Sequence, residues 1–551
     1  MCGIFGVLNN TGALSKVFVE RQFNKSAKRG PEYSKLHDFN DSTTFGFHRL
    51  AINGLDELSH QPITIDNVSV VCNGEIYNYK ALYKLLGISP KTNSDCEVIL
   101  HMYLHFGIEY TLSQLDGVFA FAIYDANTNE VFLARDPYGV RPLFYITDRE
   151  NLRGSITAFA STMQSVVSFQ KHNDRMKCNP FPPGTYSRYI LDESRSWSID
   201  CSTRYTVPGI MTMHTISSEE EALYNIERYF SEAVKKRVDT TDRPIACLLS
   251  GGLDSSLVTA LVNKFYPGKL ETYSIGLPGS EDCKYAKKVA DHLGTNHTQI
   301  TMTEQEFFDA IPNVIENIES YDTTTVRASV GNYLIGKYIS ENSKAKVIFN
   351  GDGSDELAGG YMYFHCAPNM LEFDKECKRL LNNISFFDVL RSDRSISSHG
   401  LEPRTPFLDR GFVQFYLSLP PALRFHKRNN QCEKYLLRKA FSDTGLLPNE
   451  VLWRTKEAFS DGVSSLKKSW YSIIDEKIIE QYGDTYDSIP PGVDWMHNVP
   501  VTREQIFYRR LFDRHYSGCS HTIPYFWMPK YTNAKDSSAR TLDIYKQKSN
   551  Q

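Results

Sequence analysis

The stretch Ser250-Gly251-Gly252-Leu253-Asp254-Ser255-Ser256 decides the fold of the larger part of this chain. It directly follows an apolar run, residues 245–249, and directly precedes helical spacing of apolar residues over 257–261. A glycine-rich loop between a strand and a helix presents backbone N–H groups and a helix N-terminus to phosphate oxygens. Three serines add hydroxyl donors, and Asp254 would repel phosphate unless a cation such as Mg²⁺ lay between them. We therefore expect a nucleotide site, in preference to a merely capped helix.

Strand and helix signals alternate around this loop. Apolar strand-like runs cover residues 270–275 and 347–349, and helical spacing covers residues 285–293. This alternation predicts an α/β domain built on a parallel sheet, followed by a mostly helical region after about residue 360. The loop lacks the Gly-Lys-Ser/Thr of ordinary kinases and GTPases, so those classes are disfavoured.

A second polar loop, Asn350-Gly351-Asp352-Gly353-Ser354-Asp355-Glu356, follows the apolar run 347–349. The carboxyl ends of parallel strands meet at one edge of a sheet, which is where nucleotide sites form. Its glycines and three carboxylates therefore predict the other half of a metal–nucleotide site. An acidic surface turn is the alternative, and the first loop makes that alternative weaker.

The first 190 residues or so have a different character. Short strand-like runs cover residues 3–8, 68–72, 118–124 and 131–134, and one helix is expected after Asp95. The stretch from 187 to 218 is polar, with few periodic apolar positions, and a new helix signal begins near its end. We expect a first domain over 2–190, a linker over 191–217, a second domain over 218–530 and a loosely held tail over 531–551.

Cys2 directly follows the initiator Met. If Met is removed, Cys2 carries both a thiol and a free α-amine, whose unperturbed pKa of about 7.7 to 8.0 suits a general base at neutral pH. One residue would then supply a nucleophile and its base. Taken alone, a cysteine at position two is more often structural.

Composition excludes several classes of protein. The chain of 551 residues is 41% hydrophobic and 23% charged, with a formal net charge of −4. We therefore expect no nucleic acid and no membrane as partner, and no run reaches the roughly 18 apolar residues that span a bilayer. Eleven scattered cysteines without a CxxC pair favour reduced thiols and the cytoplasm. The oligomeric state stays open, a homodimer included.

Five segments of the first domain, taken together, resemble the class II glutamine amidotransferases. They are Cys2-Gly3-Ile4-Phe5-Gly6, Arg29-Gly30-Pro31, His48-Arg49-Leu50, Asn73-Gly74-Glu75-Ile76-Tyr77-Asn78 and Ser94-Asp95. The resemblance implies that Cys2 is the nucleophile and that Asn73 and Gly74 donate to the oxyanion. Arg49 would pair with the glutamine carboxylate and Asp95 with its ammonium. The implied glutamine contacts are Arg49, Leu50, Ala51, Ile52, Asn53, Asn73, Gly74, Glu75 and Asp95.

The Ser-Gly-Gly-x-Asp-Ser loop is similar to the pyrophosphate loop of the N-type ATP pyrophosphatases, which adenylate a substrate. That similarity implies an Mg²⁺ site at Asp254 and Asp355. The implied ATP contacts are Leu249, Ser250, Gly251, Gly252, Asp254, Ser255, Ile275, Asn350 and Gly351.

The fusion of these two domains resembles the glutamine-hydrolysing asparagine synthetases over nearly the whole chain. The likeness continues through residues 321–329, 402–409 and 453–457. It implies an α/β protein of two domains: an N-terminal αββα sandwich of antiparallel sheets of the Ntn-hydrolase type, and a C-terminal parallel-sheet PP-loop domain with many helices. The implied reaction converts aspartate to asparagine through β-aspartyl-AMP, with ammonia from glutamine passing between the domains. Asp352 and Lys456 would be catalytic, and the aspartate candidates are Thr324, Thr325, Arg327, Glu402 and Arg404.

Two positions depart from the family pattern. Asn350-Gly351-Asp352 stands where members often have Ser-Gly-Glu, which shortens the acidic arm by roughly 1.5 Å. Thr162 stands where members usually have a glutamate that is tied to the domain interface. These departures put the geometry of adenylation and the coupling of the domains in question.

Other functions remain alternatives at this point. One is a different glutamine-dependent adenylating amidotransferase, although the near-neutral charge disfavours tRNA as its substrate. A second is an amidotransferase that makes a sugar amine, although such enzymes lack the Ser-Gly-Gly-x-Asp-Ser loop. A third is an inactive synthetase that serves as a glutamine sensor.

Overall fold

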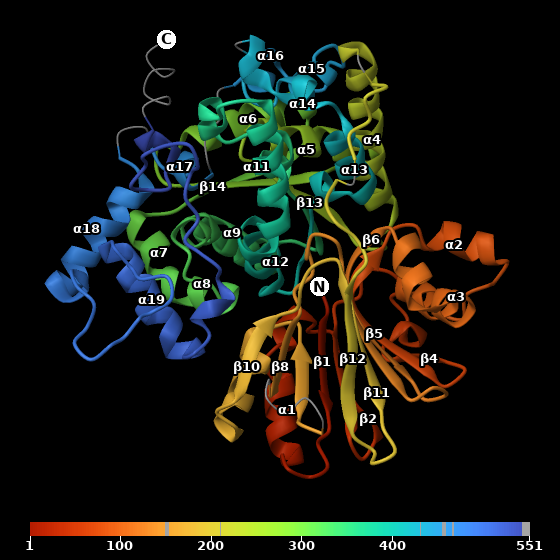
Figure 1. Cartoon of the computed structure of the whole chain (residues 1–551). Coiled ribbons are helices and arrows are strands. Elements are labelled where there is room, and N and C mark those ends of the chain that lie inside the picture. Colours follow the sequence, from red (N-terminus) through yellow and green to blue (C-terminus); the bar gives the residue numbers. More distant parts are fainter. Residues whose placement is uncertain are drawn as a thin grey trace.

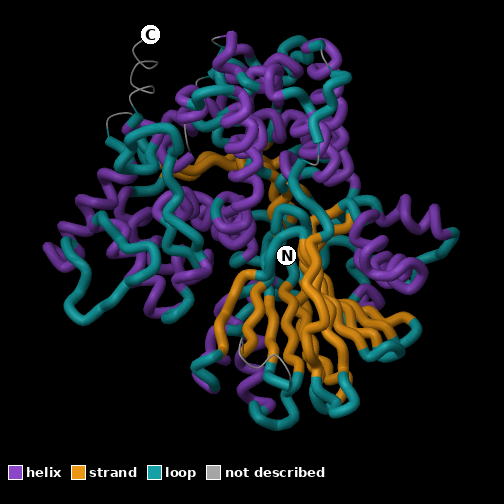
Figure 2. The backbone as a smooth tube through the Cα atoms, viewed as in Figure 1, coloured by secondary structure: helices purple, strands orange, loops and turns teal. Residues whose placement is uncertain are grey.

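The chain forms two bodies that meet around the N-terminus (Figure 1). The computed structural model describes residues 1–148, 154–209, 211–216, 218–429, 431–454, 459–465 and 468–542. Strands gather in the first body and helices dominate the second (Figure 2).

The first body contains two six-stranded sheets whose neighbouring strands are all antiparallel. One sheet runs in the order β10 (Met176–Pro180), β8 (Phe144–Asp148), β9 (Thr157–Ala160), β1 (Gly3–Leu8), β3 (Thr43–Arg49) and β2 (Tyr33–Asn40). The other runs in the order β12 (Trp197–Arg204), β11 (Thr185–Leu191), β7 (Glu130–Arg135), β6 (Gly117–Asp125), β5 (Val68–Ile76) and β4 (Ile63–Ile65).

Side-chain alternation along the strands builds the layers of this body. On β6, Ala120 and Ala122 face the core between the sheets, while Phe119 and Phe121 face a second core on the outer side. That outer core includes residues of α2 (Tyr79–Leu86) and α3 (Val98–Gln114), and α1 (Lys16–Asn24) packs on the outer side of the other sheet. Because both faces of the central strands are buried, they are continuously apolar. The predicted αββα sandwich is confirmed.

The expected linker is partly regular structure. β12 lies within residues 191–217 and pairs with β11. It is an edge strand whose side chains are mostly exposed or half-buried, apart from the buried Trp197. Such a strand is rich in polar residues, and its composition therefore resembled that of a linker.

The second body is built on a five-stranded parallel sheet, as predicted. Its strand order is β15 (Asn296–Thr301), β14 (Glu271–Gly276), β13 (Ile245–Leu248), β16 (Val347–Phe349) and β17 (Glu402–Arg404). The order reverses between β13 and β16, and ligands bind at such switch points in open parallel sheets. Both predicted polar loops begin there.

Helices surround this sheet on both faces. They are α4 (Glu219–Asp239), α5 (Leu253–Phe265), α6 (Glu281–Leu293), α7 (Glu304–Asp309), α8 (Ile311–Ile318), α9 (Thr323–Asn342), α10 (Ser354–Ala358), α11 (Met370–Asn383), α12 (Asp388–Ser397), α13 (Arg410–Ser418), α14 (Pro421–Arg424), α15 (Tyr435–Ala440), α16 (Asn449–Leu452), α17 (Phe459–Gly462), α18 (Trp470–Tyr482) and α19 (Arg503–Tyr516). Within the described ranges, no helix is long and apolar enough to cross a membrane.

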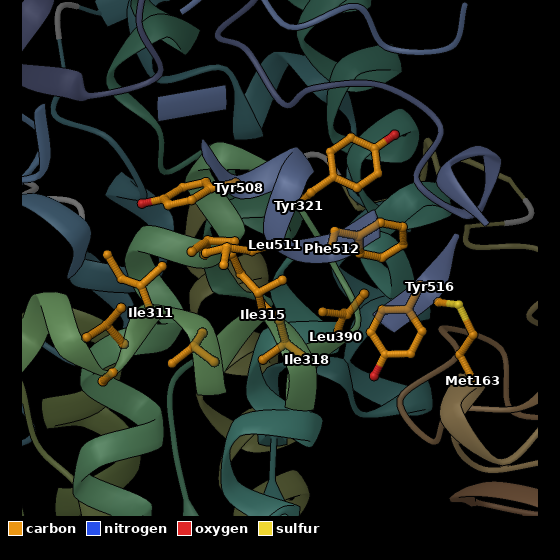
Figure 3. Packing of buried hydrophobic residues seen from close by; sticks show 14 of the residues in the cluster. Met163, Ile311, Ile315, Ile318, Tyr321, Leu390, Tyr508, Leu511, Phe512 and Tyr516 are labelled. Carbon is orange, nitrogen blue, oxygen red and sulfur yellow. The ribbon is translucent and has the colours of Figure 1, made fainter. Parts of the chain in front are cut away.

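One apolar core continues from the first body into the second. Met163 of the first body belongs to the same cluster of buried residues as Ile318, Leu390 and Tyr516 of the second. Figure 3 shows Met163 beside Tyr516, at the edge of the helices α8 and α19. Burial of apolar surface therefore holds the two bodies together.

The tail that was expected to be loosely held is attached over its described part. The carboxylate of Asp536 forms hydrogen bonds with Arg327, and Ser538 donates to Asp461. Leu542 is buried. The expectation was wrong for residues 531–542, because their polar side chains have partners within the fold. Residues 543–551 lie outside the described residues.

Candidate active sites in the two domains

Cys2 lies directly before β1, at the junction of the two bodies. Its Sγ lies 3.6 Å from the carbonyl oxygen of Leu50, to which it donates, and its own carbonyl oxygen accepts from Nε of Arg29 at 3.1 Å. Burial raises the pKa of the Cys2 thiol and lowers that of the Met1 α-ammonium to about 6. Met1 itself is 1% exposed, so in the unprocessed chain it lies buried between the bodies.

Asn73 and Gly74 lie on β5, next to β6. Asn73 is fully buried, and its Nδ2 is 3.5 Å from Oγ of Ser161. Its Oδ1 has no hydrogen-bond partner among the described residues. A Cβ at position 74 would lie 2.5 Å from the carbonyl oxygen of Val118, so only glycine fits there. A buried amide with so few partners is unusual for a structural asparagine, which suits an oxyanion donor.

The two charged groups of the predicted glutamine clamp are both buried. Arg49 donates to the carbonyl oxygens of Asp56, at 2.9 Å, and of Gly54. Asp95 accepts from the N–H of Ile76 at 2.7 Å, and burial raises the pKa of its carboxyl to about 6. Both side chains are therefore fixed by the backbone before any ligand binds.

The remaining predicted glutamine contacts divide into two groups. Leu50 provides the acceptor for Cys2, and Ala51 and Ile52 are buried beside it. Asn53 donates to Glu75, whose carboxylate also lies 3.2 Å from Arg404 of the second body. The side chain of Glu75 thus belongs to the junction between the bodies.

That junction contains a buried layer of alternating charges. Its ion pairs are Arg29–Asp393 at 2.9 Å, Arg141–Asp393 at 3.4 Å, Arg141–Glu402 at 3.6 Å, Arg404–Glu402 at 2.9 Å and Arg404–Glu75 at 3.2 Å. Arg29, Arg141 and Glu75 come from the first body, and the others come from the second. Each charge is compensated by an opposite charge, as burial requires.

The Ser-Gly-Gly-x-Asp-Ser loop connects β13 to the N-terminus of α5. Ser250 and Ser255 close it through their hydroxyl groups, 2.9 Å apart. Gly251 has φ +72°, and a Cβ there would lie 2.4 Å from the backbone nitrogen of Ala286. This position therefore requires glycine both for its conformation and for its close packing. The first N–H groups of α5 lack partners within the helix and can bind an anion.

The second loop packs directly on the first. A Cβ at Gly351 would lie 2.8 Å from the backbone carbon of Asp254. Asn350 is buried and donates to Ser392 of α12 at 2.6 Å. The two loops therefore form one wall of a single cavity.

Asp254 and Asp355 converge on one cation. Nζ of Lys434 lies 2.5 Å from a carboxylate oxygen of each, and Lys434 is 2% exposed. Two acidic side chains whose oxygens meet at one point of positive charge fit a metal ion with oxygen ligands. Among the described residues, no group of three or more His, Cys, Asp or Glu side chains that could hold a metal ion occurs.

A second cluster of charges joins the predicted Asp352 and Glu356 to three residues of the cavity that were not predicted from the sequence. Arg391 lies 2.5 Å from Asp352 and 2.9 Å from Asp388. The hydroxyl of Tyr361 donates to Glu356, and its oxygen lies 3.1 Å from a carboxylate oxygen of Asp388. Burial raises the pKa of the Asp352 carboxyl, and the adjacent Arg391 opposes that rise. The signal that could have revealed Arg391 is its spacing of three residues from Asp388 on one helix.

The cavity brings together most of the predicted nucleotide residues. Its lining includes Leu249, Ser250, Gly252, Asp254, Ser255, Ile275, Asn350, Gly351, Asp352 and Asp355. It also includes Thr324, Asp388, Arg391, Lys434 and Arg454.

Four of the five aspartate candidates do not line the cavity. Arg327 is paired with Glu504 at 2.5 Å and with Asp536 at 2.7 Å, and Thr325 donates to Asp322. Glu402 and Arg404 lie in the charge layer between the bodies. Only Thr324 reaches the cavity. Lys456 lies outside the described residues.

The fold and the two sites together define a glutamine amidotransferase joined to an ATP-using synthetase. The chain matches the family model described as asparagine synthase over residues 225–375 and 368–538, and the glutamine amidotransferase domain over residues 1–195. It belongs to the glutamine-hydrolysing asparagine synthetase family.

Relatives of similar length support this assignment. The chain is 43% identical to the asparagine synthetase (glutamine-hydrolyzing) of Gallus gallus over 579 residues, which covers 99% of each protein. The corresponding proteins of Mus musculus and Homo sapiens are 43% and 42% identical over 571 residues, again with 99% of both chains covered.

Proposed function

We propose that this enzyme converts L-aspartate to L-asparagine with ATP and with ammonia from glutamine, and that it releases AMP, pyrophosphate and glutamate. The observation that carries the proposal is the presence of both sites in one chain, with Cys2 at their junction. The full-length similarity to glutamine-hydrolysing asparagine synthetases supports the same reaction.

Glutamine hydrolysis begins at Cys2 once Met1 has been removed. The free α-amine takes the proton of the thiol, and the thiolate attacks the side-chain amide of glutamine. Asn73 and the N–H of Gly74 stabilise the oxyanion, and the α-ammonium gives its proton to the amide nitrogen so that ammonia leaves. Water then hydrolyses the thioester, which releases glutamate and restores the thiol. Arg49 and Asp95 hold the two charged ends of the amino acid.

Adenylation takes place in the cavity between the two polar loops. The aspartate β-carboxylate attacks the α-phosphorus of ATP, and pyrophosphate leaves. The N-terminus of α5 and the serine hydroxyls hold the pyrophosphate oxygens. Asp254 and Asp355 would hold Mg²⁺, which neutralises phosphate charge when it is bound. Ammonia from the first domain then displaces AMP from the acyl-adenylate.

Aspartate is held by Thr324 and Arg391 in this proposal. Arg391 lines the cavity and has a guanidinium that can pair with a carboxylate. It lies beside Asp352, which the family resemblance implies to be catalytic. Arg327 is not among the residues that line this cavity, so we do not include it in the proposed aspartate site.

We also propose a domain boundary after Arg204, where β12 ends, so that residues 205–217 form the linker. The near-neutral charge supports the absence of a nucleic-acid partner. Eleven free cysteines without a disulfide support a reducing compartment, the cytoplasm. The possibility of a homodimer is best tested by measuring the mass in solution.

The experiment uses purified protein, with removal of Met1 verified by mass spectrometry. Asparagine, AMP, pyrophosphate and glutamate are quantified with aspartate, MgATP and either glutamine or ammonia. With either nitrogen source, we expect asparagine, AMP and pyrophosphate to form in equal amounts. Cys2→Ala should abolish only the glutamine-dependent route. Glutamate release without asparagine or pyrophosphate would contradict the proposed synthetase.

A further inference from the structure

Glu319 of the second domain contacts the first domain beside the glutamine site. Its Oε1 accepts from the backbone N–H of Gln164 at 2.9 Å, and its Oε2 lies 3.1 Å from Arg394. The side chain is 1% exposed, so both interactions are shielded from water. A carboxylate buried this deeply is retained only with such partners.

The backbone at Glu319 favours a different residue. Glu319 ends α8 in the left-handed conformation, with φ +58° and ψ +39°. Glycine is the usual residue at this position of a helix, because other side chains rarely adopt that conformation. The value of glutamate here must therefore lie in its carboxylate.

From Gln164 a short path leads to the oxyanion residue. Gln164 lies in a single turn of 3-10 helix, Met163–Ser165, that directly follows Ser161 and Thr162. The Oγ of Ser161 accepts from the N–H of Ile4 at 2.9 Å and faces Nδ2 of Asn73 at 3.5 Å. Met163 packs beside Tyr516 of the second domain, which secures the same turn by apolar contact (Figure 3).

In the other direction, Glu319 is connected to the adenylation cavity by two routes. Along the chain, Glu319 lies three residues before Asp322, which caps α9 by accepting from the N–H of Thr325. Thr324, in the first turn of α9, lines the cavity. Its partner Arg394 lies on α12, three residues after Arg391, which also lines the cavity. A shift of either helix on binding substrate would move the carboxylate of Glu319.

We propose that Glu319 is a positioning residue that makes glutamine hydrolysis respond to occupancy of the adenylation cavity. With aspartate and MgATP bound, Glu319 holds the 163–165 turn so that Ser161 orients Asn73 toward the oxyanion. This inference rests on the proposed function.

The test compares Glu319→Gly, Glu319→Gln and the parent enzyme. Glycine suits the left-handed backbone, so the first variant removes the carboxylate without straining the chain. Glutamine keeps an acceptor oxygen for Gln164 and loses the charge that faces Arg394. Glu316→Gln is the matched control, because it neutralises a carboxylate on a side chain that is 44% exposed, one turn earlier on the same helix.

Glutamate release is measured with and without aspartate and MgATP, and asparagine synthesis is measured with ammonia. The parent should release glutamate about 5-fold faster or more when both substrates are present, as couplings between sites commonly give. In Glu319→Gly this ratio should fall to about one, in Glu319→Gln it should be intermediate, and Glu316→Gln should behave like the parent. The KM for glutamine and the ammonia-dependent rate should stay within about twofold of the parent, since neither binding site is touched.

Three outcomes would overturn the inference. One is a parent enzyme whose glutamate release does not respond to the second site, and another is a Glu319→Gly variant that keeps the full response. The third is a parallel loss of ammonia-dependent synthesis and melting temperature, which would make Glu319 a structural residue only. If the parent made no asparagine even from ammonia, the proposed function would fail first, independently of Glu319.

Discussion

Replacing Asn73 with alanine tests whether this residue contributes to glutamine hydrolysis or to the stability of the first domain. Asn73 makes one long side-chain hydrogen bond, to Ser161, and its Oδ1 has no partner among the described residues. An unsatisfied buried polar group costs about 1 to 3 kcal/mol, so losing this amide offsets part of the cost of the small cavity that remains. We expect the free energy of unfolding to change by no more than about 1 kcal/mol.

The effect on the reaction should be much larger. Removal of one side-chain donor from an oxyanion hole typically lowers kcat about 10² to 10³-fold, or about 2.7 to 4 kcal/mol in transition-state stabilisation. The KM for glutamine should stay nearly constant, because the proposed ground-state contacts, Arg49 and Asp95, are untouched. Ammonia-dependent synthesis should also be unchanged.

The assay measures glutamate release at several glutamine concentrations, together with thermal unfolding. Asn179→Ala provides the control, because it removes a buried asparagine of the same domain on β10, away from Cys2. A glutaminase kcat for Asn73→Ala within about threefold of the parent would refute the oxyanion role, since a threefold decrease is far smaller than the decrease expected when such a donor is lost. A large fall in melting temperature would show that Asn73 is mainly structural.

Three further perturbations test the remaining parts of the two sites. Asp254→Asn should remove both glutamine- and ammonia-dependent synthesis while basal glutamate release persists, because it weakens only the proposed metal–pyrophosphate site. Full synthetic activity of this variant would contradict the assignment of Asp254 to that site. Arg391→Met removes the proposed partner of the substrate carboxylate, which also pairs with the partly buried Asp352 and Asp388. It should lower ammonia-dependent kcat/KM for aspartate by about 10- to 10²-fold, since a hydrogen bond to a charged group contributes about 1.5 to 3 kcal/mol. An unchanged value would remove Arg391 from the aspartate site. The pKa of Asp95 is raised to about 6, so its carboxylate is ionised above that pH and neutral below it. We therefore expect kcat/KM for glutamine to fall as the pH drops through about 6. A profile that stays flat down to about pH 5 would contradict the pairing of Asp95 with the substrate ammonium.

Much of the architecture could be predicted from the sequence because local patterns determine it. The strands Gly3–Leu8 and Val347–Phe349 have the predicted bounds, since apolar residues on both faces of a buried strand leave a continuous signal. Loops with several glycines were equally informative. Gly251 cannot be replaced for reasons of both conformation and packing, and such constraints are visible in the sequence.

Residues that long-range packing brings together were not predictable in this way. Asp388 and Arg391 lie on α12, and Lys434 directly precedes α15. Neither segment carries a glycine-rich signature, and only the fold places these residues opposite the loops. The same limit explains the expectation for Arg327, whose partner Asp536 lies more than two hundred residues further along the chain. The polar edge strand β12 was missed for a simpler reason, because most of its side chains are not fully buried.

The burial of Met1 between the domains has a consequence for the synthesis of the protein. An aminopeptidase needs an extended, accessible N-terminus, and the docked domains provide none at a residue that is 1% exposed. The methionine must therefore be removed while Cys2 is still uncovered, before Asp393, Glu402 and Arg404 have left the ribosome and folded over it. At about 5 to 20 residues per second, the roughly 400 intervening residues allow about 20 to 80 seconds for this step. If Cys2 is the nucleophile, as proposed, a chain that keeps Met1 beyond this interval would have its synthetase cavity but no glutaminase.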